Sequence, residues 1–363
     1  MNKILFSNLT RQYAVLREEI LDITDSVLSS GRLMDGEYTQ QFEKWLADKN
    51  DSIYAITCNS GTVALEIIAR YYKEKYQSHI KKFTAIIPSL TYPATANAFI
   101  NAGWNIRFSD VDKYGLLSSD FMFEGDELPV MAVLVGLYGS SIHKIINKLA
   151  YNRPFVPMVE DAAQHWLANN SKRYGYASAI SFDPTKNFGN YGNGGAIITD
   201  VRMLAEYAKE HRNNGKPSNQ RSGSNLRMSE VDCAQLMIKT QYIDEWQARR
   251  KSIFKYWLEV FGENGVDVVL DEPEFDSHSY HKFVIMHNDR NTLKSVLHEK
   301  NIETKIHYEF PLFELPAYYS YSNPSISSRA SMLSRSVLSL PCYPELTDAE
   351  VEYIAENVVK CYS

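Results

Sequence analysis

Cysteine is scarce in this chain of 363 residues. The four cysteines lie far apart and form no CxxC pair; they are Cys58, Cys233, Cys342 and Cys361. Zinc sites and disulfide frameworks need cysteines at close or recurring spacings. The spacing found here therefore argues against both and favours free thiols.

Long apolar runs and blocks of like charge are also missing. No stretch is apolar enough to span a bilayer, and the chain reaches Arg11 and Arg17 without the apolar core of a signal peptide. We therefore expect no membrane as a partner and a cytoplasmic location. The net charge of -6 is spread along the chain, so no basic patch favours nucleic acid as a partner.

Short apolar runs alternate with helical patterns in the N-terminal part of the chain. The pattern over residues 61–76, for example, places Leu65, Ile68 and Tyr72 on one helical face. The predicted strands are residues 53–57, 84–88, 106–108, 130–137, 156–159, 179–182 and 196–199. Strands that alternate with helices predict an α/β fold with a mainly parallel mixed sheet flanked by helices. Ligands of such a sheet bind at the carboxyl ends of its strands.

The sequence changes character from Ser229 onward. A long, charged helical stretch runs through Trp257, and the capping box Thr347-Asp348-Ala349-Glu350 opens a final helix. Between them we predict strands over residues 266–270 and 281–286 and a helix over 292–300. The chain therefore divides into a large domain, residues 1–240, and a smaller α+β domain, residues 241–363. We expect residues 1–20 to pack on the smaller domain.

One lysine stands between a predicted strand and a glycine-rich loop. Lys186 follows the strand ending at Phe182, and the preceding strand ends in the carboxylate Asp161. Pyridoxal phosphate (PLP) forms a Schiff base with a lysine, and an acid keeps its pyridine nitrogen protonated. The lysine must reach its neutral form, which a desolvated pocket favours. Alone, Lys186 fits an ordinary solvated loop and Asp161 a helix cap; as a pair they favour PLP.

Two further strand ends carry groups that suit this cofactor. Ser60-Gly61-Thr62 lies between a strand and a helix, where backbone N–H groups and the helix dipole attract a phosphate. The same tripeptide is also a routine helix cap, and neither a P-loop nor a GxGxxG motif is present. Tyr92 follows the next strand, where its ring can stack on a pyridine ring, although a core position would suit it equally well.

With these residues, the sequence resembles the PLP-dependent nucleotide-sugar aminotransferases of the DegT/DnrJ/EryC1/StrS family, which have the type I fold of the aspartate aminotransferase superfamily. The matching segments run nearly from end to end and, in this order, are highly specific. They are residues 59–65, 88–97, 160–164, 181–186, 192–199, 225–228, 306–308 and 338–341.

The resemblance implies a role for each matching site residue. Lys186 is the Schiff-base lysine and Asp161 the partner of the pyridine nitrogen. The other implied cofactor contacts are Gln164 near the ring hydroxyl, Tyr92 on the ring face, and Ser60, Gly61, Thr62 and Ser181 at the phosphate, joined by Asn225 from the second subunit. The resemblance thus implies a homodimer with shared active sites. It also implies substrate contacts from Asp183, His307 and Tyr308.

The implied reaction moves an amino group from L-glutamate to a nucleotide-linked keto-deoxysugar, for surface polysaccharide such as lipopolysaccharide O-antigen or for glycosides. The loop over residues 187–195 is similar to that of members that aminate C-3, which favours a dTDP-linked 3-keto-6-deoxyhexose or a UDP-linked 3-keto sugar. Asp183, Glu309 and Phe313 depart from residues frequent in the family, so the sugar preference can differ if they face the pocket.

Other functions remain open from the sequence. Amination at C-4 is the first alternative, and a non-catalytic PLP-binding regulator is the second, because a fold does not settle function. A PLP dehydratase of the same family commonly has histidine in place of the lysine, so Lys186 argues against it. A plain nucleotide-binding module would leave Lys186, Tyr92 and Asp161 unexplained.

Overall fold

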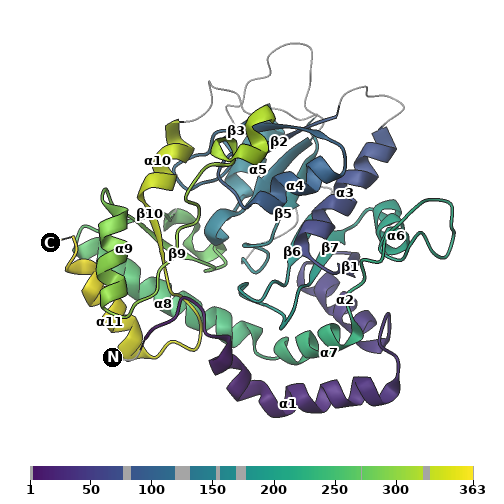
Figure 1. Ribbon diagram of the computed structural model, residues 1–363, viewed down its shortest axis with the longest axis horizontal. Coiled ribbons are helices and arrows are strands. Elements are labelled where there is room, and N and C mark those ends of the chain that lie inside the picture. Colours follow the sequence, from purple (N-terminus) through teal and green to yellow (C-terminus); the bar gives the residue numbers. More distant parts are fainter. Residues whose placement is uncertain are drawn as a thin grey trace.

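The computed structural model describes residues 3–76, 83–118, 131–152, 156–168, 177–270, 272–321 and 328–362. A seven-stranded sheet forms its centre (Figure 1). In spatial order the strands are β1 (Tyr54–Cys58), β7 (Gly195–Thr199), β6 (Ser178–Ser181), β5 (Met158–Asp161), β4 (Met131–Val135), β2 (Thr84–Pro88) and β3 (Asn105–Ser109). Strand β7 is antiparallel to both neighbours, and every other adjacent pair is parallel. The predicted mainly parallel mixed sheet is confirmed.

The predicted strand bounds agree closely with the observed ones. Strand 84–88 and helix 61–76 have the predicted bounds, and five other strands of the large sheet and the two predicted C-terminal strands differ by at most two residues at each end. The strand predicted over 130–137 ends earlier, at Val135, and residue 130 lies outside the described residues. It ends because the chain turns into a short 3-10 helix, Leu137–Gly139, in which Tyr138 has a φ of 64°.

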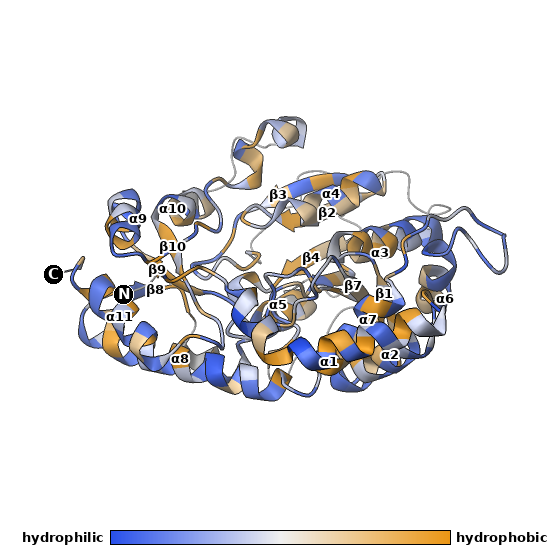
Figure 2. Ribbon diagram, turned by 60° about the horizontal axis from the view of Figure 1, so that its bottom comes forward, coloured by the Kyte–Doolittle hydropathy of each residue, from blue (hydrophilic) through white to orange (hydrophobic). Residues whose placement is uncertain are grey.

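Helices bury both faces of the large sheet. Along β2, Ala85 and Ile87 pack on one face and Ile86 on the other, as the two-residue period of a strand requires. One face is covered by α3 (Gly61–Tyr76), α4 (Pro93–Asn101) and α6 (Arg202–His211), and the other by α2 (Glu37–Lys49), α5 (His143–Asn152) and α7 (Glu230–Lys239). Figure 2 shows hydrophobic residues along β2 and β4 and mixed faces on α1 and α8.

The N-terminal segment contacts both halves of the molecule. Ile4 forms a β-bridge with Ile302, and its N–H donates to the Asn301 carbonyl at 2.8 Å. The long helix α1 (Leu9–Ser30) then packs along α7, with Leu16 and Ile20 buried beside Trp246. The sequence analysis did not predict α1 or α2.

A second, antiparallel sheet lies in the C-terminal part. Its strands are β10 (Val337–Leu340), β9 (Phe283–Met286) and β8 (Asp267–Val268), and its helices are α8 (Ile243–Glu263), α9 (Arg290–Glu299), α10 (Ser328–Ser336) and α11 (Asp348–Val359). Trp257 of α8, Phe283 of β9 and Ile354 of α11 share one buried cluster. The boundary near residue 240 stays a prediction.

One local prediction about helix ends is confirmed and one is wrong. The capping box is present: the Thr347 hydroxyl accepts from the Glu350 N–H, and the Glu350 carboxylate accepts from the Thr347 N–H. The long helical stretch from Ser229, by contrast, is interrupted between α7 and α8. The Thr240 hydroxyl donates back to the Met237 carbonyl at 2.7 Å, an interaction that helps to end or bend helices.

The carboxyl ends of six strands, all except β7, meet at one edge of the large sheet. Strand β1 is parallel to β6 because both are antiparallel to β7, and β6, β5, β4 and β2 are parallel in turn. Side chains that follow these strands therefore gather in one place. None of the described helices combines the length and apolar content needed to cross a bilayer.

Candidate active site

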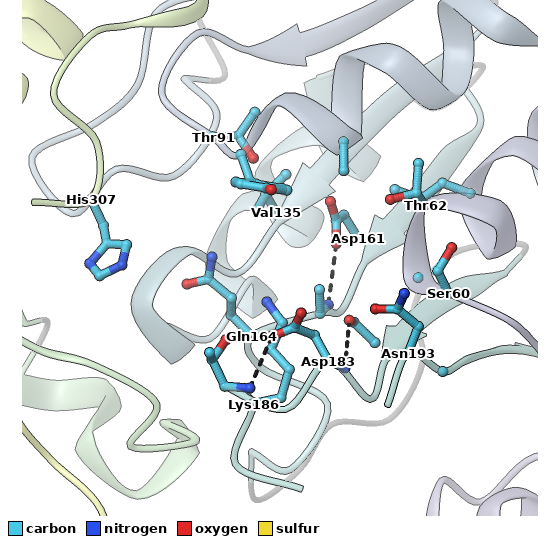
Figure 3. A pocket seen from close by; sticks show the side chains of 18 of the residues that line it. Ser60, Thr62, Thr91, Val135, Asp161, Gln164, Asp183, Lys186, Asn193 and His307 are labelled. Carbon is cyan, nitrogen blue, oxygen red and sulfur yellow. Dashed lines mark hydrogen bonds between the residues drawn. The ribbon is translucent and has the colours of Figure 1, made fainter. Parts of the chain in front are cut away.

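A cavity of about 570 Å³ lies at this edge of the sheet (Figure 3). Segments after β1, β2, β5 and β6 line it, together with residues from the C-terminal part. The predicted site residues in its wall are Ser60, Gly61, Thr62, Tyr92, Asp161, Gln164, Ser181, Asp183, Lys186, His307 and Tyr308. The fold thus brings together every predicted site residue except Asn225.

Asp161 is buried at the last position of β5. Its Oδ2 accepts from the Thr95 hydroxyl at 2.7 Å, and its Oδ1 accepts from the Ala163 N–H at 3.2 Å. Burial raises the pKa of Asp161, while these two hydrogen bonds oppose the rise. A buried carboxylate that faces a cavity stays charged most favourably when a cationic N–H group approaches it. This arrangement fits a protonated pyridine nitrogen.

Lys186 lies on a tight turn that begins at Asp183. The Lys186 N–H donates to the Asp183 carbonyl at 2.9 Å, and the Asp183 Oδ1 accepts from the Thr185 N–H at 2.9 Å. Burial lowers the pKa of Lys186, and the charges of Asp161 and Asp183 oppose the shift. No carboxylate of the described residues forms an ion pair with the Lys186 ammonium. Lys186 therefore reaches its neutral form at a lower pH than a surface lysine does.

A second buried lysine supports the loop that follows Lys186. The Lys239 Nζ donates to the Gly189 carbonyl at 2.7 Å and lies 3.7 Å from the centre of the Tyr191 ring. Burial lowers the pKa of Lys239 to about 7. Lys239 thus ties α7 to the glycine-rich loop and positions Lys186 indirectly.

Replacing Lys239 by methionine should change the pH dependence of stability. The folded pKa of Lys239, about 7, lies below its unfolded value of about 10.4, so the unfolded chain binds more protons between these pH values. As the pH increases from about 7 to about 10, the free energy of unfolding of the wild type should therefore rise relative to that of Lys239→Met. Urea denaturation at several pH values measures the difference. A difference that does not change with pH would show that Lys239 remains charged in the folded state.

The N-terminus of α3 provides the predicted phosphate cradle. The N–H groups of Gly61 and Thr62 donate to no described residue, and the Val63 N–H donates to the Ser60 hydroxyl at 3.2 Å. Open N–H groups at a helix N-terminus attract anions. Three side chains that would approach such an anion, Ser60, Thr62 and Asn193, lie together in Figure 3. The donors therefore fit a phosphate group.

The cradle depends on close packing of two loops. A Cβ atom at Gly195 would lie 2.3 Å from the Ser60 carbonyl carbon, a distance that backbone atoms do not tolerate. At Gly192, in the same loop, the nearest atom would be 3.6 Å away, which is an ordinary contact. The two glycines therefore form a matched pair for testing the cradle.

Gly195→Ala should displace the Ser60–Gly61 turn and weaken cofactor binding by about tenfold or more, whereas Gly192→Ala should bind PLP as the wild type does. Equilibrium dialysis of PLP, followed by its absorption, measures both affinities. Equal affinities of the two variants would indicate that the turn does not hold the phosphate. Thermal melting of both variants without PLP controls for a general loss of stability.

Hydrogen bonds and ring contacts hold the side chains of Gln164, Tyr92 and His307 in the cavity wall. The Gln164 Oε1 accepts from the Tyr138 N–H at 2.8 Å, and its Nε2 donates to the Tyr308 hydroxyl at 3.2 Å. The Tyr92 ring is 58% exposed and lies 6.1 Å from the Tyr308 ring. His307 is paired with the Ser339 hydroxyl at 2.8 Å, and burial lowers its pKa to about 2. His307 is therefore uncharged at neutral pH.

Several predicted residues lie outside the cavity wall. Asn225 is exposed, and its backbone pairs with Asn213 instead. Its contact from a second subunit stays a prediction. Of the three departures from the family pattern, Asp183 lines the cavity, Glu309 is exposed, and Phe313 packs against the apolar clusters. Asp183 alone among them reaches the cavity from within its own chain.

Sequence reasoning missed five polar residues of the site: Thr91, Thr95, Thr185, Asn193 and Lys282. Thr91 and Thr95 share a hydrogen bond of 2.9 Å, and both belong to the segment that matched the family. Their four-residue spacing after a strand was an available signal. Lys282 follows an unremarkable run of polar residues and precedes a short strand, so nothing in the sequence marked it.

Comparisons with known proteins identify the family of this chain. A model of the DegT/DnrJ/EryC1/StrS aminotransferase family matches residues 14–359. The chain is 31% identical to the dTDP-3-amino-3,4,6-trideoxy-alpha-D-glucose transaminase of Streptomyces venezuelae, covering 95% of this chain and 92% of that protein. It is also 31% identical to the dTDP-3-amino-3,6-dideoxy-alpha-D-galactopyranose transaminase of Aneurinibacillus thermoaerophilus, with 94% and 95% covered.

A solved structure agrees over the whole length of the chain. The crystal structure of S. venezuelae DesV in complex with a ketimine intermediate matches with a TM-score of 0.91 and 29% identity, covering 100% of this chain and 99% of that one. The family match, the type I fold and the residues at the strand ends lead to one conclusion. The chain belongs to the DegT/DnrJ/EryC1/StrS aminotransferase family and is a PLP-dependent sugar aminotransferase.

Proposed function

We propose that this enzyme transfers an amino group from L-glutamate to C-3 of a nucleotide-linked keto-deoxysugar. A dTDP-linked 3-keto-6-deoxyhexose is the favoured acceptor, and a UDP-linked 3-keto sugar is the second choice. Both relatives named above are transaminases of dTDP-linked 3-amino sugars, and the loop over residues 187–195 is similar to that of C-3 aminating members. Amination at C-4 is the alternative. The observation that carries the proposal is that the half-buried Lys186 and the buried carboxylate of Asp161 line one cavity.

The residues of the cavity suit each part of the cofactor. Asp161 would hold the pyridine nitrogen, the α3 N-terminus with Ser181 the phosphate, and Tyr92 the ring face. Gln164 would approach the ring hydroxyl through its amide, which already contacts Tyr308. When bound, PLP supplies an aldehyde that reacts with amines and a ring that takes up electrons from a carbon losing its proton.

The chain's own residues perform the proton transfers. Lys186 Nζ, made neutral more readily by burial, takes the proton from the α-carbon of the amino donor. In the second half of the reaction it returns a proton to the sugar carbon that receives the amino group. Asp161 would keep its negative charge throughout and so hold the ring nitrogen in its protonated form. His307 stays neutral. It can therefore donate a hydrogen bond to the sugar or accept one from it without adding charge.

The first test is a visible absorption spectrum of the PLP-loaded protein before and after L-glutamate is added without any sugar. We expect glutamate to convert the spectrum to that of the pyridoxamine form. Adding dTDP-linked 3-keto-6-deoxyglucose should then restore the original spectrum, and NMR of the product locates the new amine at C-3 or C-4. An unchanged spectrum with glutamate and with other amino acids would contradict the proposal and favour the non-catalytic regulator.

We further propose a homodimer with shared active sites, in the cytoplasm, whose product serves surface polysaccharide or glycoside synthesis. Asn225 is exposed and does not line the cavity of its own chain, although the adjacent Leu226 carbonyl accepts from the Asn59 N–H beside the cradle at 2.9 Å. The Asn225 side chain is thus available to the phosphate site of a second subunit.

Mixing two inactive variants should restore activity. Lys186→Ala lacks the amine, and Asn225→Asp places a negative charge near the phosphate of the partner. In a mixed dimer one of the two sites has both native residues, so random exchange should restore about a quarter of the wild-type rate. Activity assays before and after mixing, with size-exclusion chromatography as a control for dimers, measure this. Continued inactivity of a confirmed mixed dimer would place Asn225 outside the partner's site.

A further inference from the structure

A second lysine, Lys282, lines the same cavity as Lys186. It stands directly before β9, its backbone N–H donates to the Tyr138 carbonyl at 2.9 Å, and its side chain is 9% exposed. It also lines a smaller cavity behind Lys186, which it shares with Thr185 and Lys186. Its ammonium forms no hydrogen bond or ion pair with any residue that the structure describes. Lys282 is therefore a buried amine without a counter-charge among the described residues.

The charges around Lys282 make this position unfavourable in the absence of a ligand. Burial, followed by the charges of Lys186, Arg250 and Lys305, lowers its pKa, and Asp183 opposes the shift. His281 and His307, which also lie near these lysines, have lowered pKa values and add no charge. A buried ammonium that lacks a partner is costly, and an arriving anion removes that cost.

The proposed amino donor brings such an anion into the cavity. L-Glutamate carries two carboxylates, and both must enter a space in which Lys186 has to remain free to react. Apart from Lys186, the described side chains of the wall include one amine that an anion can hold in its charged form, Lys282, because His307 is neutral. A carboxylate bonded to the α-carbon lies close to the atom whose proton Lys186 removes. Lys282 shares both cavities with Lys186 and is therefore in a suitable place to bind it.

We propose that Lys282 binds a substrate carboxylate and thereby makes the cavity selective for acidic substrates. The inference rests on the proposed sugar aminotransferase function and deepens it. The carboxylate comes from the amino donor or from an acidic sugar, a nucleotide-linked uronate. The chemistry of recognition, a charge-assisted hydrogen bond in a partly desolvated cavity, is the same for both.

The N-terminal segment supports this position of the ammonium. The Phe6 ring centre lies 5.4 Å from the Lys282 Nζ and 5.1 Å from the Lys305 Nζ, and the Phe6 N–H donates to the Glu303 carboxylate at 3.0 Å. An aromatic face favours the charged form of a nearby lysine. Lys305 has the same charge and contacts the same ring, but it is exposed and does not line the cavity. Lys305 is therefore a matched control.

Calorimetric titration of the PLP-loaded dimer with succinate, a dicarboxylate without an amino group, tests the proposal without turnover. Lys282→Gln should raise the Kd of succinate by about 10- to 100-fold, and Lys305→Gln should change it by less than about twofold. An unchanged cofactor spectrum and melting temperature of Lys282→Gln control for misfolding. A third variant, Lys282→Arg, should retain most of the affinity because it retains the charge.

A second pair of probes, UDP-glucuronate and UDP-glucose, distinguishes the two sources of the carboxylate. If Lys282→Gln weakens succinate, the carboxylate belongs to the donor; if it weakens UDP-glucuronate alone, the carboxylate belongs to the sugar. Equal weakening of UDP-glucose and UDP-glucuronate with unchanged succinate would assign Lys282 to the diphosphate and overturn the proposal. Unchanged affinities for all three probes would overturn it as well. Because no probe reacts, failure of the proposed transamination shows separately, as an unchanged spectrum with glutamate.

Discussion

Lys186→Ala should abolish transamination, with a fall in kcat of about 10⁴-fold or more. The variant lacks the amine that carries the proton from the α-carbon of the donor and returns it to the sugar. Its cavity is otherwise intact, because the turn that holds Lys186 depends on backbone groups and on Asp183. When the amino sugar product is added, cofactor and sugar should therefore remain bound together. Stopped-flow absorption measures the rate, and mass spectrometry under native conditions detects the retained sugar.

Lys186→Arg separates the role of the amine from that of the positive charge. Arginine keeps the charge beside Asp161 and Asp183 but does not become neutral in a protein. It should therefore be as inactive as Lys186→Ala. A small primary amine in solution should partly rescue the alanine variant, which has space for it, and not the arginine variant. Wild-type rates in either variant would mean that another group moves the proton.

The sequence predicted the position of the site better than its internal contacts. Asp161 ends a strand, and the cradle, Tyr92 and Lys186 lie in the segments that follow strands, so knowing that these strands are parallel is enough to gather them at one edge. The hydrogen bond from Thr95 to Asp161 joins residues that are 66 positions apart. It depends on β4 lying between β2 and β5, an order that local patterns do not contain.

Burial of charged residues was the least predictable feature. Lys239 is the last residue of α7, where a lysine is normally solvated, and Lys282 adjoins a short strand. Both are buried because elements distant in the sequence cover them: the loop around Gly189 covers Lys239, and the segment around Phe6 covers Lys282. Long-range packing of this kind leaves no period or motif in the chain.

The missed N-terminal helices have a different cause. Helix α1 extends over 22 residues but fully buries only Leu16, Ile20 and Val27 among its described residues, a sparse apolar stripe. Such a stripe is a weak signal because most of the helix faces solvent. The structure shows that α1 is held along α7 and beside Trp246, contacts between residues that lie far apart in the sequence.

Asp161→Asn should lower the rate of the glutamate half-reaction by about 10³-fold or more, equivalent to about 4 kcal/mol. Asparagine has nearly the same shape and can retain the contacts with Thr95 and Ala163, but it carries no charge to keep the ring nitrogen protonated. Thr95→Val is the graded comparison, because it removes one hydrogen bond from the carboxylate and should cost about tenfold. Single-turnover absorption with glutamate measures both rates, and the PLP content of the purified variants controls for loss of cofactor. If Asp161→Asn reacted as fast as Thr95→Val, the charge of Asp161 would not be what the reaction requires, and Asp161 would instead be a residue that positions the ring.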